Sequence, residues 1–284
     1  MIEFVSAIVE HAFLRNALLT GLLVSVACGL VGSYVVVRRM TYIAGGIAHC
    51  VLGGIGAAVY LERAHGWSML DPLYGAVVAA LVAAVAIGLV SLRARERVDT
   101  AIGATWAIGM ATGVLFLART PGYAQDLMGY LFGNILLVSV RDMQIIGAFD
   151  AIILVTALAF HNQLLSISFD EEYARARGIN VDFYHMLLLV LVALTVVLLV
   201  TVVGVVLVIA LLTIPAAIAG RFRGTLTHMM GLAVLVSAAL TTGGLAVSYG
   251  LNTPTGATIV LLAGAAYVVS MLVARQYARR RRET

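Results

Sequence analysis

Residues 40–61 read MTYIAGGIAHCVLGGIGAAVYL, a stretch of 22 residues that carries no formal charge. A helix of about 20 apolar residues is long enough to cross a lipid bilayer. The stretch also contains five glycines and one histidine, His49, and a helix that faces only lipid has no use for an ionisable side chain at this depth. It therefore predicts a transmembrane helix that packs inside a bundle of other helices.

The composition of the chain also indicates a membrane protein. Of its 284 residues, 62% are hydrophobic and 11% are charged, whereas soluble domains are about half apolar and about a quarter charged. We expect an all-α polytopic membrane protein that forms one transmembrane domain, residues 1–284, with about nine transmembrane helices. The expected spans are roughly 14–37, 42–61, 72–92, 100–118, 143–162, 183–203, 205–220, 227–248 and 256–275. Eight spans are the alternative, because the sixth and seventh share one apolar run and only the region of Gly204 separates them.

Arginine placement predicts the orientation of these spans. All 18 basic residues are arginine, and the positive-inside rule places the arginine-rich connections in the cytoplasm. With the N-terminus outside and the C-terminus in the cytoplasm, only four arginines remain outside: Arg15, Arg63, Arg119 and Arg141. We therefore expect this orientation. The basic tail at 279–282 is expected to contact anionic membrane lipid rather than nucleic acid.

The absence of lysine excludes several kinds of site. The chain has no lysine for a nucleotide-binding P-loop or for a Schiff base. If nucleotide drives this protein, another chain must bind it. The two cysteines, Cys28 and Cys50, both lie in apolar spans and lack CxxC spacing, so neither a disulfide framework nor a structural zinc site is expected. We expect no cofactor bound by this chain.

His49 is the candidate metal contact. On a helix, Gly45, Gly46, Gly53 and Gly56 lie on the same face as His49, and small residues on one face let neighbouring helices approach closely. This face is therefore predicted to point at protein rather than lipid, which places the imidazole inside the bundle. A neutral imidazole is a ligand for zinc, iron and manganese. The alternative is a histidine that only hydrogen-bonds to a neighbouring helix.

The segment 165–183 is the most charged part of the chain and lies on the expected cytoplasmic side. Three acids precede two arginines and a glycine, in the order Asp170, Glu171, Glu172, Arg175, Arg177 and Gly178. Acidic residues suit the start of a helix, and glycine suits its left-handed C-terminal cap. The pattern predicts a short helix between two spans. Such a helix serves equally well as a docking surface for a cytoplasmic partner or as an ordinary amphipathic connector.

Two further acids are candidates for an ion path or gate. Asp126 lies in the segment 118–134 on the expected outer side, where glycines and mixed polarity favour a re-entrant gate, with a plain loop as the alternative. Asp150 is the only acid inside an expected span. It either joins a polar pathway or is solvated near the outer interface of the membrane, and we expect the interface.

Ordered sequence blocks along nearly the whole chain resemble one family of membrane proteins. The blocks are GLLVSVACGLVGSYVVVRRM, GGIAHCVLGGIG, DPLYGA, RVDTAIGATWAIGMATGVLFL, DLMGYLFGNILLVS, SFDEEYARARGIN, TVVGVVLVIALLTIPAAIA and NTPTGATIVLLAGA. Together they are similar to the integral membrane permeases of ABC importers for zinc, manganese and iron. The number and order of the blocks make the resemblance specific.

The resemblance implies partners, roles and a place in a bacterial or archaeal cytoplasmic membrane. It implies a homodimer of permeases docked on a cytoplasmic ABC ATPase dimer, with an extracytoplasmic metal-binding protein that delivers the ion. It also implies that SFDEEYARARGI is the coupling helix that seats on the ATPase. The family commonly places an aspartate four residues before the histidine that matches His49, and this chain has Gly45 there. A second ligand must then come from elsewhere, or the ion passes with little coordination, which suits a conduit that must release it.

The rival functions need features that the sequence lacks. A stand-alone secondary transporter needs ligands for a coupling ion inside the membrane, where only His49 and Asp150 are available. An ABC permease for an iron chelate or corrinoid needs a wider pore than the glycine-lined second helix suggests. An intramembrane enzyme needs paired carboxylates, an HExxH motif or a serine–lysine pair, and the spans contain none of these. We therefore expect a transport subunit without an enzymatic site, which moves a zinc, manganese or iron ion while a partner hydrolyses ATP.

Overall fold

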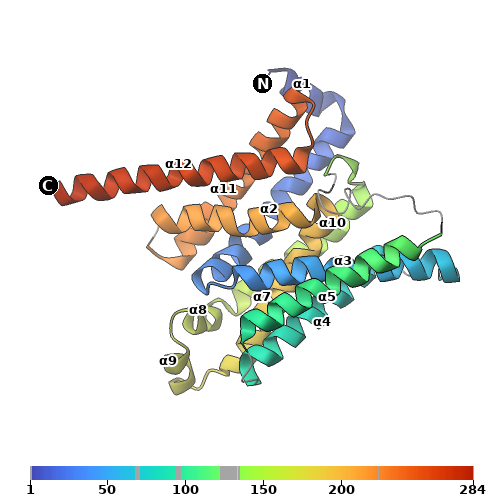
Figure 1. The fold of residues 1–284 in the computed structure, drawn as a ribbon. Coiled ribbons are helices and arrows are strands. Elements are labelled where there is room, and N and C mark those ends of the chain that lie inside the picture. The colour runs from blue at the N-terminus through green and yellow to red at the C-terminus, as the bar shows by residue number, and fades with distance from the viewer. Residues whose placement is uncertain are drawn as a thin grey trace.

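The computed structural model describes residues 2–67, 71–93, 97–121, 133, 135–222 and 224–283. These residues are almost entirely helical and include no strand (Figure 1). The helices are α1 (Ile2–Glu10), α2 (Ala12–Val37), α3 (Thr41–His65), α4 (Pro72–Arg93), α5 (Val98–Arg119), α7 (Val140–Ala159), α8 (His161–Phe169), α9 (Glu171–Ala176), α10 (Val181–Phe222), α11 (Leu226–Leu251), α12 (Thr255–Glu283) and the short 3₁₀ helix η1 (Ile135–Leu137).

Eight helices in the described part of the chain are long and apolar enough to cross a membrane. They are α2, α3, α4, α5, α7, α10, α11 and α12. The prediction of an all-α polytopic membrane protein is thereby confirmed. Each of the nine expected spans falls on one of these helices, because α10 holds both the sixth and the seventh. The eight-helix alternative therefore describes the helices, and the ninth expected span is the second part of α10.

The long helix α10 is broken at Gly204. It has 42 residues, and the φ of 78° and ψ of 163° at Gly204 are not helical. Only glycine adopts this conformation readily. Figure 1 shows the two parts of α10 meeting at a steep angle. Gly133 lies against the bend, because a Cβ atom at Gly133 would overlap the backbone of Val203.

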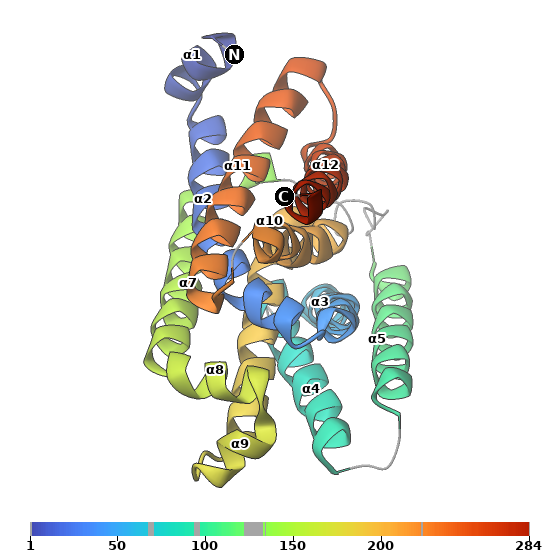
Figure 2. The same ribbon diagram turned by 90° about the vertical axis from the view of Figure 1, so that its left-hand side faces the viewer.

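The helix α10 also forms the centre of the bundle. It contacts α2, α3, α4, α7, α11 and α12. Figure 2 shows α3, α4 and α5 on one side of it and α2, α7 and α11 on the other. Most of the α10 residues are buried, which accounts for a sequence that is apolar all round rather than along one stripe.

Glycines hold α3 close to α5. A Cβ atom at Gly53 would come within 2.7 Å of the Gly109 carbonyl oxygen, and one at Gly56 within 2.7 Å of the Gly113 carbonyl oxygen. Both distances are too short for a real side chain, so only glycine permits the approach. The prediction that this face of α3 points at protein is therefore confirmed, and the neighbour is α5.

One end of the bundle gathers several polar connections. Figure 1 shows the turn between α2 and α3, the α8–α9 segment and the C-terminal end of α12 at this end. The short helix predicted within 165–183 is present as α9. The Asp170 carboxylate accepts a hydrogen bond from the Tyr173 amide at 2.9 Å and caps its start. Gly178 has a φ of 76° just after its end, as expected for a left-handed cap.

Candidate functional site

His49 is half-buried on α3, and one of its ring nitrogens is held by its own helix. The Nδ1 atom lies 3.0 Å from the carbonyl oxygen of Gly45. Because a carbonyl oxygen only accepts, this contact places the proton on Nδ1 and leaves the lone pair on Nε2. Metal-binding histidines are oriented in the same way, by a second ring nitrogen that donates to a carbonyl or carboxylate. The geometry therefore presents Nε2 as the nitrogen available to a metal ion.

Trp106 on α5 covers the face of the His49 ring. The two rings are stacked, with centroids 4.0 Å apart and planes 23° from parallel. A Cβ atom at Gly45 would lie 3.7 Å from the Trp106 ring and 3.6 Å from the Ile209 side chain on α10. Both are ordinary contact distances, so a methyl group would fit there. Gly45 therefore lies close to both rings of the stack.

Trp106 is not among the residues that the sequence predicted for this site. A signal was present, because tryptophan in a membrane protein favours the interface between lipid and water, whereas Trp106 lies near the middle of an expected span. The position indicates that the indole has a specific partner inside the bundle. Naming that partner requires knowing that α5 lies beside α3.

The other glycines proposed for an ion path are packing positions in this structure. A Cβ atom at Gly46 would come within 2.8 Å of the Ile102 side chain, and Gly53 lies on Gly109. Both glycines therefore sit in the contact between α3 and α5. Their part in an ion path stays a prediction.

Asp150 is not solvated, so the expectation of an interfacial carboxylate is wrong. It lies at the middle of α7 and is 6% exposed. Its carboxylate accepts a hydrogen bond from the backbone amide of Ala27 on α2 at 3.1 Å. The packing of α7 on α2 buries it, and that packing cannot be read from the α7 sequence. The burial favours the other alternative, a polar group inside the bundle.

No complete metal site is formed by the described residues. Nowhere among them are three or more His, Cys, Asp or Glu side chains grouped closely enough to hold a metal ion. His49 therefore offers a single imidazole to an ion. Asp126 and the central part of the proposed gate, 122–132, lie outside the described residues.

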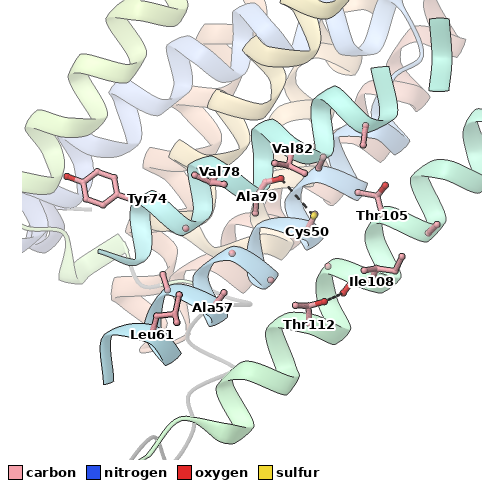
Figure 3. A pocket seen from close by; sticks show the side chains of 18 residues that line it. Cys50, Ala57, Leu61, Tyr74, Val78, Ala79, Val82, Thr105, Ile108 and Thr112 are labelled. Carbon is pink, nitrogen blue, oxygen red and sulfur yellow. Dashed lines mark hydrogen bonds between the residues drawn. The ribbon is translucent and has the colours of Figure 1, made fainter. Parts of the chain in front are cut away.

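An apolar pocket between α3, α4 and α5 is a poor candidate for the ion path. Its volume is about 680 Å³, and its lining is almost wholly apolar. The hydroxyls of Thr105 and Thr112 donate back to carbonyls of their own helix. The other polar side chains of the lining are Tyr74 and Cys50, and Figure 3 shows the Cys50 thiol directed at the Ala79 carbonyl oxygen 4.0 Å away. The pocket has no set of side chains suited to binding a metal ion.

The charged residues of the α9 segment divide into two sets. Glu171 turns toward the bundle and forms an ion pair with Arg38 at the end of α2. Arg175 pairs with Asp182 at 3.0 Å, and both of these side chains are more than half exposed. Glu172 and Arg177 are exposed as well. The outer face of α9 is therefore a charged surface, and one acid ties the helix to α2.

The chain is similar to known membrane proteins along nearly its whole length. The ABC 3 transport family matches residues 10–274. A membrane protein of Synechocystis is 41% identical over 275 residues, which cover 97% of this chain and 95% of that protein. The manganese import system permease protein ScaB of Streptococcus gordonii is 32% identical over 272 residues, which cover 96% of this chain and 95% of ScaB.

A solved structure agrees with these sequence relatives. PsaBC from Streptococcus pneumoniae, in complex with Fab, has a TM-score of 0.83 and 37% sequence identity, with 95% of each chain covered. The resemblance carried by the ordered sequence blocks is thereby confirmed. Because the family match spans almost all of the chain and the fold is a bundle of membrane-crossing helices, this protein is a multi-pass membrane protein that belongs to the ABC 3 transport family.

Proposed function

We propose that this chain is the permease subunit of an ABC importer that carries a divalent transition-metal ion into the cell, with manganese as the first candidate. The observation that carries the proposal is its end-to-end similarity to ScaB, a manganese import permease. Zinc and iron are the competing ions. The chain itself is the conduit, and a separate ATPase subunit hydrolyses ATP.

In this proposal His49 contacts the ion in passing through Nε2. Its Nδ1 contact with Gly45 and its stack on Trp106 support the assignment, because both hold the ring in one orientation. The described residues add no cluster of further ligands. Weak coordination suits a conduit, since an ion that binds too tightly is not released.

The proposed assembly contains two copies of this chain, a cytoplasmic ABC ATPase dimer and an extracytoplasmic metal-binding protein. The ATPase docks on 166–182, where α9 presents exposed charges. This docking places the α8–α9 end of the bundle, the C-terminus and most of the arginines in the cytoplasm, and the N-terminus outside. That orientation agrees with the positive-inside rule.

The alternative functions have less support. A stand-alone secondary transporter leaves the exposed charges of α9 without a role. A permease for an iron chelate needs a wide passage, and the apolar pocket beside α3 has too few polar groups to bind a chelate's oxygens. The proposal of a bare ion therefore stands ahead of both.

The test is metal uptake in a bacterial strain that lacks its own manganese importers. The chain is expressed with its partner ATPase and metal-binding protein, and uptake of radioactive manganese is measured with zinc or iron(II) as competitors. We expect manganese accumulation that His49→Ala reduces at least about tenfold, since even loss of a group that only orients a metal ligand typically costs about 10- to 100-fold in metal affinity or activity. The matched control is His65→Ala, which removes an exposed histidine from the same helix.

Each result has a defined meaning. Stronger competition by zinc or iron(II) than by unlabelled manganese would move the assignment to that ion. Normal uptake by His49→Ala would leave His49 as a packing residue. Uptake that proceeds without the ATPase would overturn the ABC importer in favour of a secondary transporter.

A further inference from the structure

An ion pair between a buried arginine and a partly exposed glutamate joins the end of α2 to the start of α9. The Arg38 guanidinium contacts the Glu171 carboxylate, and the Arg38 side chain is only 9% exposed, against 46% for Glu171. One guanidinium nitrogen of Arg38, Nη1, is buried without a hydrogen-bond partner in the described structure. Burial lowers the pKa of Arg38, and the carboxylate of Glu171 acts in the opposite direction. Glu171 is therefore the main compensation for a desolvated charge.

A second tie joins the same face of α2 to the start of α8. The hydroxyl of Tyr34 lies 2.9 Å from His161 Nδ1, and Tyr34 is fully buried. His161 Nε2 lies 3.4 Å from the Thr227 hydroxyl on α11. Because Tyr34 and Arg38 are four residues apart, they lie on one face of α2. The α8–α9 segment is thus attached at the start of each of its helices to a single turn of α2.

This turn of α2 leads directly into α3. The Met40 amide donates to the Val35 carbonyl at 2.8 Å and the Arg39 amide to the Val36 carbonyl at 3.1 Å. Arg39 has a φ of 57°. These bonds form a compact left-handed cap, and α3 begins at Thr41. A movement of Arg38 therefore reaches the first turns of α3, and His49 lies on that helix.

We propose that Arg38 is the positioning residue that transmits movement of the α8–α9 segment to α3 and hence to His49. The inference rests on the proposed function, in which the ATPase docks on α9. The exposed charges on the outer face of α9 then bind the ATPase, while Glu171, through its ion pair with Arg38, passes the motion on to α2. A rigid turn between two packed helices is a suitable element, because packed helices shift as units rather than deform continuously.

The test uses the full complex of permease and ATPase in proteoliposomes, with the metal-binding protein supplied on the side that corresponds to the cell exterior. It measures manganese transported per ATP hydrolysed, together with the amount of ATPase that co-purifies. We expect Arg38→Gln and Glu171→Gln to lower the transport-to-hydrolysis ratio about tenfold, in the range of ordinary coupling effects. Co-purification of the ATPase should stay unchanged. The double variant Arg38→Glu with Glu171→Arg should recover part of the ratio.

The matched control is Arg39→Gln, which removes the same charge at the neighbouring, exposed position. It should keep the parental ratio. An unchanged transport-to-hydrolysis ratio in both single variants would overturn the inference. Loss of the ATPase from both variants would also overturn it, because the Arg38–Glu171 pair would then act in docking or folding. The Glu171→Gln variant keeps the test decisive if Arg38→Gln does not assemble. The parent complex is measured first. If it binds no ATPase or transports no metal, the proposed function fails. If the parent and both variants transport the same amount of metal per ATP hydrolysed, only the inference about Arg38 is refuted.

Discussion

At the scale of single residues, His49 is oriented by a backbone carbonyl and by an aromatic ring. The carbonyl oxygen of Gly45 lies 3.0 Å from the ring nitrogen Nδ1, and a Cβ atom at Gly45 would be in ordinary contact with Trp106. The family pattern implied by the resemblance has an aspartate at this position. A carboxylate attracts a cation strongly, whereas a carbonyl that only orients the imidazole does not add a charge. Under the proposed function, the arrangement in this chain therefore suits brief contact with a metal ion and its release.

We predict that Trp106→Ala lowers manganese uptake several-fold, because the imidazole loses the ring that holds it in place. Trp106→Phe keeps an aromatic face and should retain most of the uptake. Trp67→Ala is the control, since Trp67 is 56% exposed. The measurement is initial uptake rate at equal amounts of membrane-inserted protein. Equal uptake by Trp106→Ala and the parent would mean that the stack has no part in transport.

At the scale of helices, the contact between α3 and α5 depends on glycines on both sides. A Cβ atom at Gly109 would lie 2.5 Å from the Cys50 Cα atom, so a side chain there must push the helices apart. Gly103 lies on the same helix with no atom within 4 Å of the corresponding position. The two glycines therefore differ in packing but not in residue type or helix.

We predict that Gly109→Val lowers the free energy of unfolding by about 1–3 kcal/mol, the usual cost of overpacking, and also lowers uptake by shifting Trp106 away from His49. Gly103→Val should behave like the parent. Thermal unfolding in detergent, followed by the amount of monodisperse protein, gives the comparison. If both variants unfold at the same temperature as the parent, the close contact between α3 and α5 is not needed for stability.

The outer face of α9 is the predicted docking surface for the ATPase. Glu172→Ala combined with Arg175→Ala removes two exposed charges and leaves the Arg38–Glu171 pair in place. We expect less ATPase in the purified complex and a loss of ATP-driven uptake, with normal insertion of the permease. Pull-down of the ATPase at low and high salt measures the effect, since exposed ion pairs weaken with salt. Unchanged co-purification and unchanged coupling would exclude this face as the docking surface.

At the scale of the whole molecule, α10 organises the bundle. Its break at Gly204 divides it into two apolar segments, and Gly133 packs against that break. Gly133 belongs to the segment 119–134, which is the one proposed as a gate. The gate would then lie beside the irregular backbone at Gly204. Irregular backbone is tolerated inside a membrane where surrounding protein shields it from lipid. The gating role of 119–134 stays a prediction.

The sequence by itself determined the helical membrane architecture. Long charge-free runs allow only helices, because lipid offers no hydrogen bonds to an open backbone. The glycine spacing determined which face of α3 meets protein, since periodicity on a helix is a local property. The charge order and Gly178 likewise determined the short helix α9 and its cap. All of these features depend on neighbours in the sequence.

Only the tertiary structure decided which residues those helices bring together. It placed Trp106 on His49, buried Asp150 against Ala27, and paired Arg38 with Glu171 across 133 positions of sequence. Each contact joins two helices, and in lipid many pairings of apolar helices have similar free energies, because burial from water does not distinguish them. Close packing of small residues and a few buried polar bonds select one pairing. That selection depends on the shapes of whole helices, so it is absent from any single stretch of the sequence.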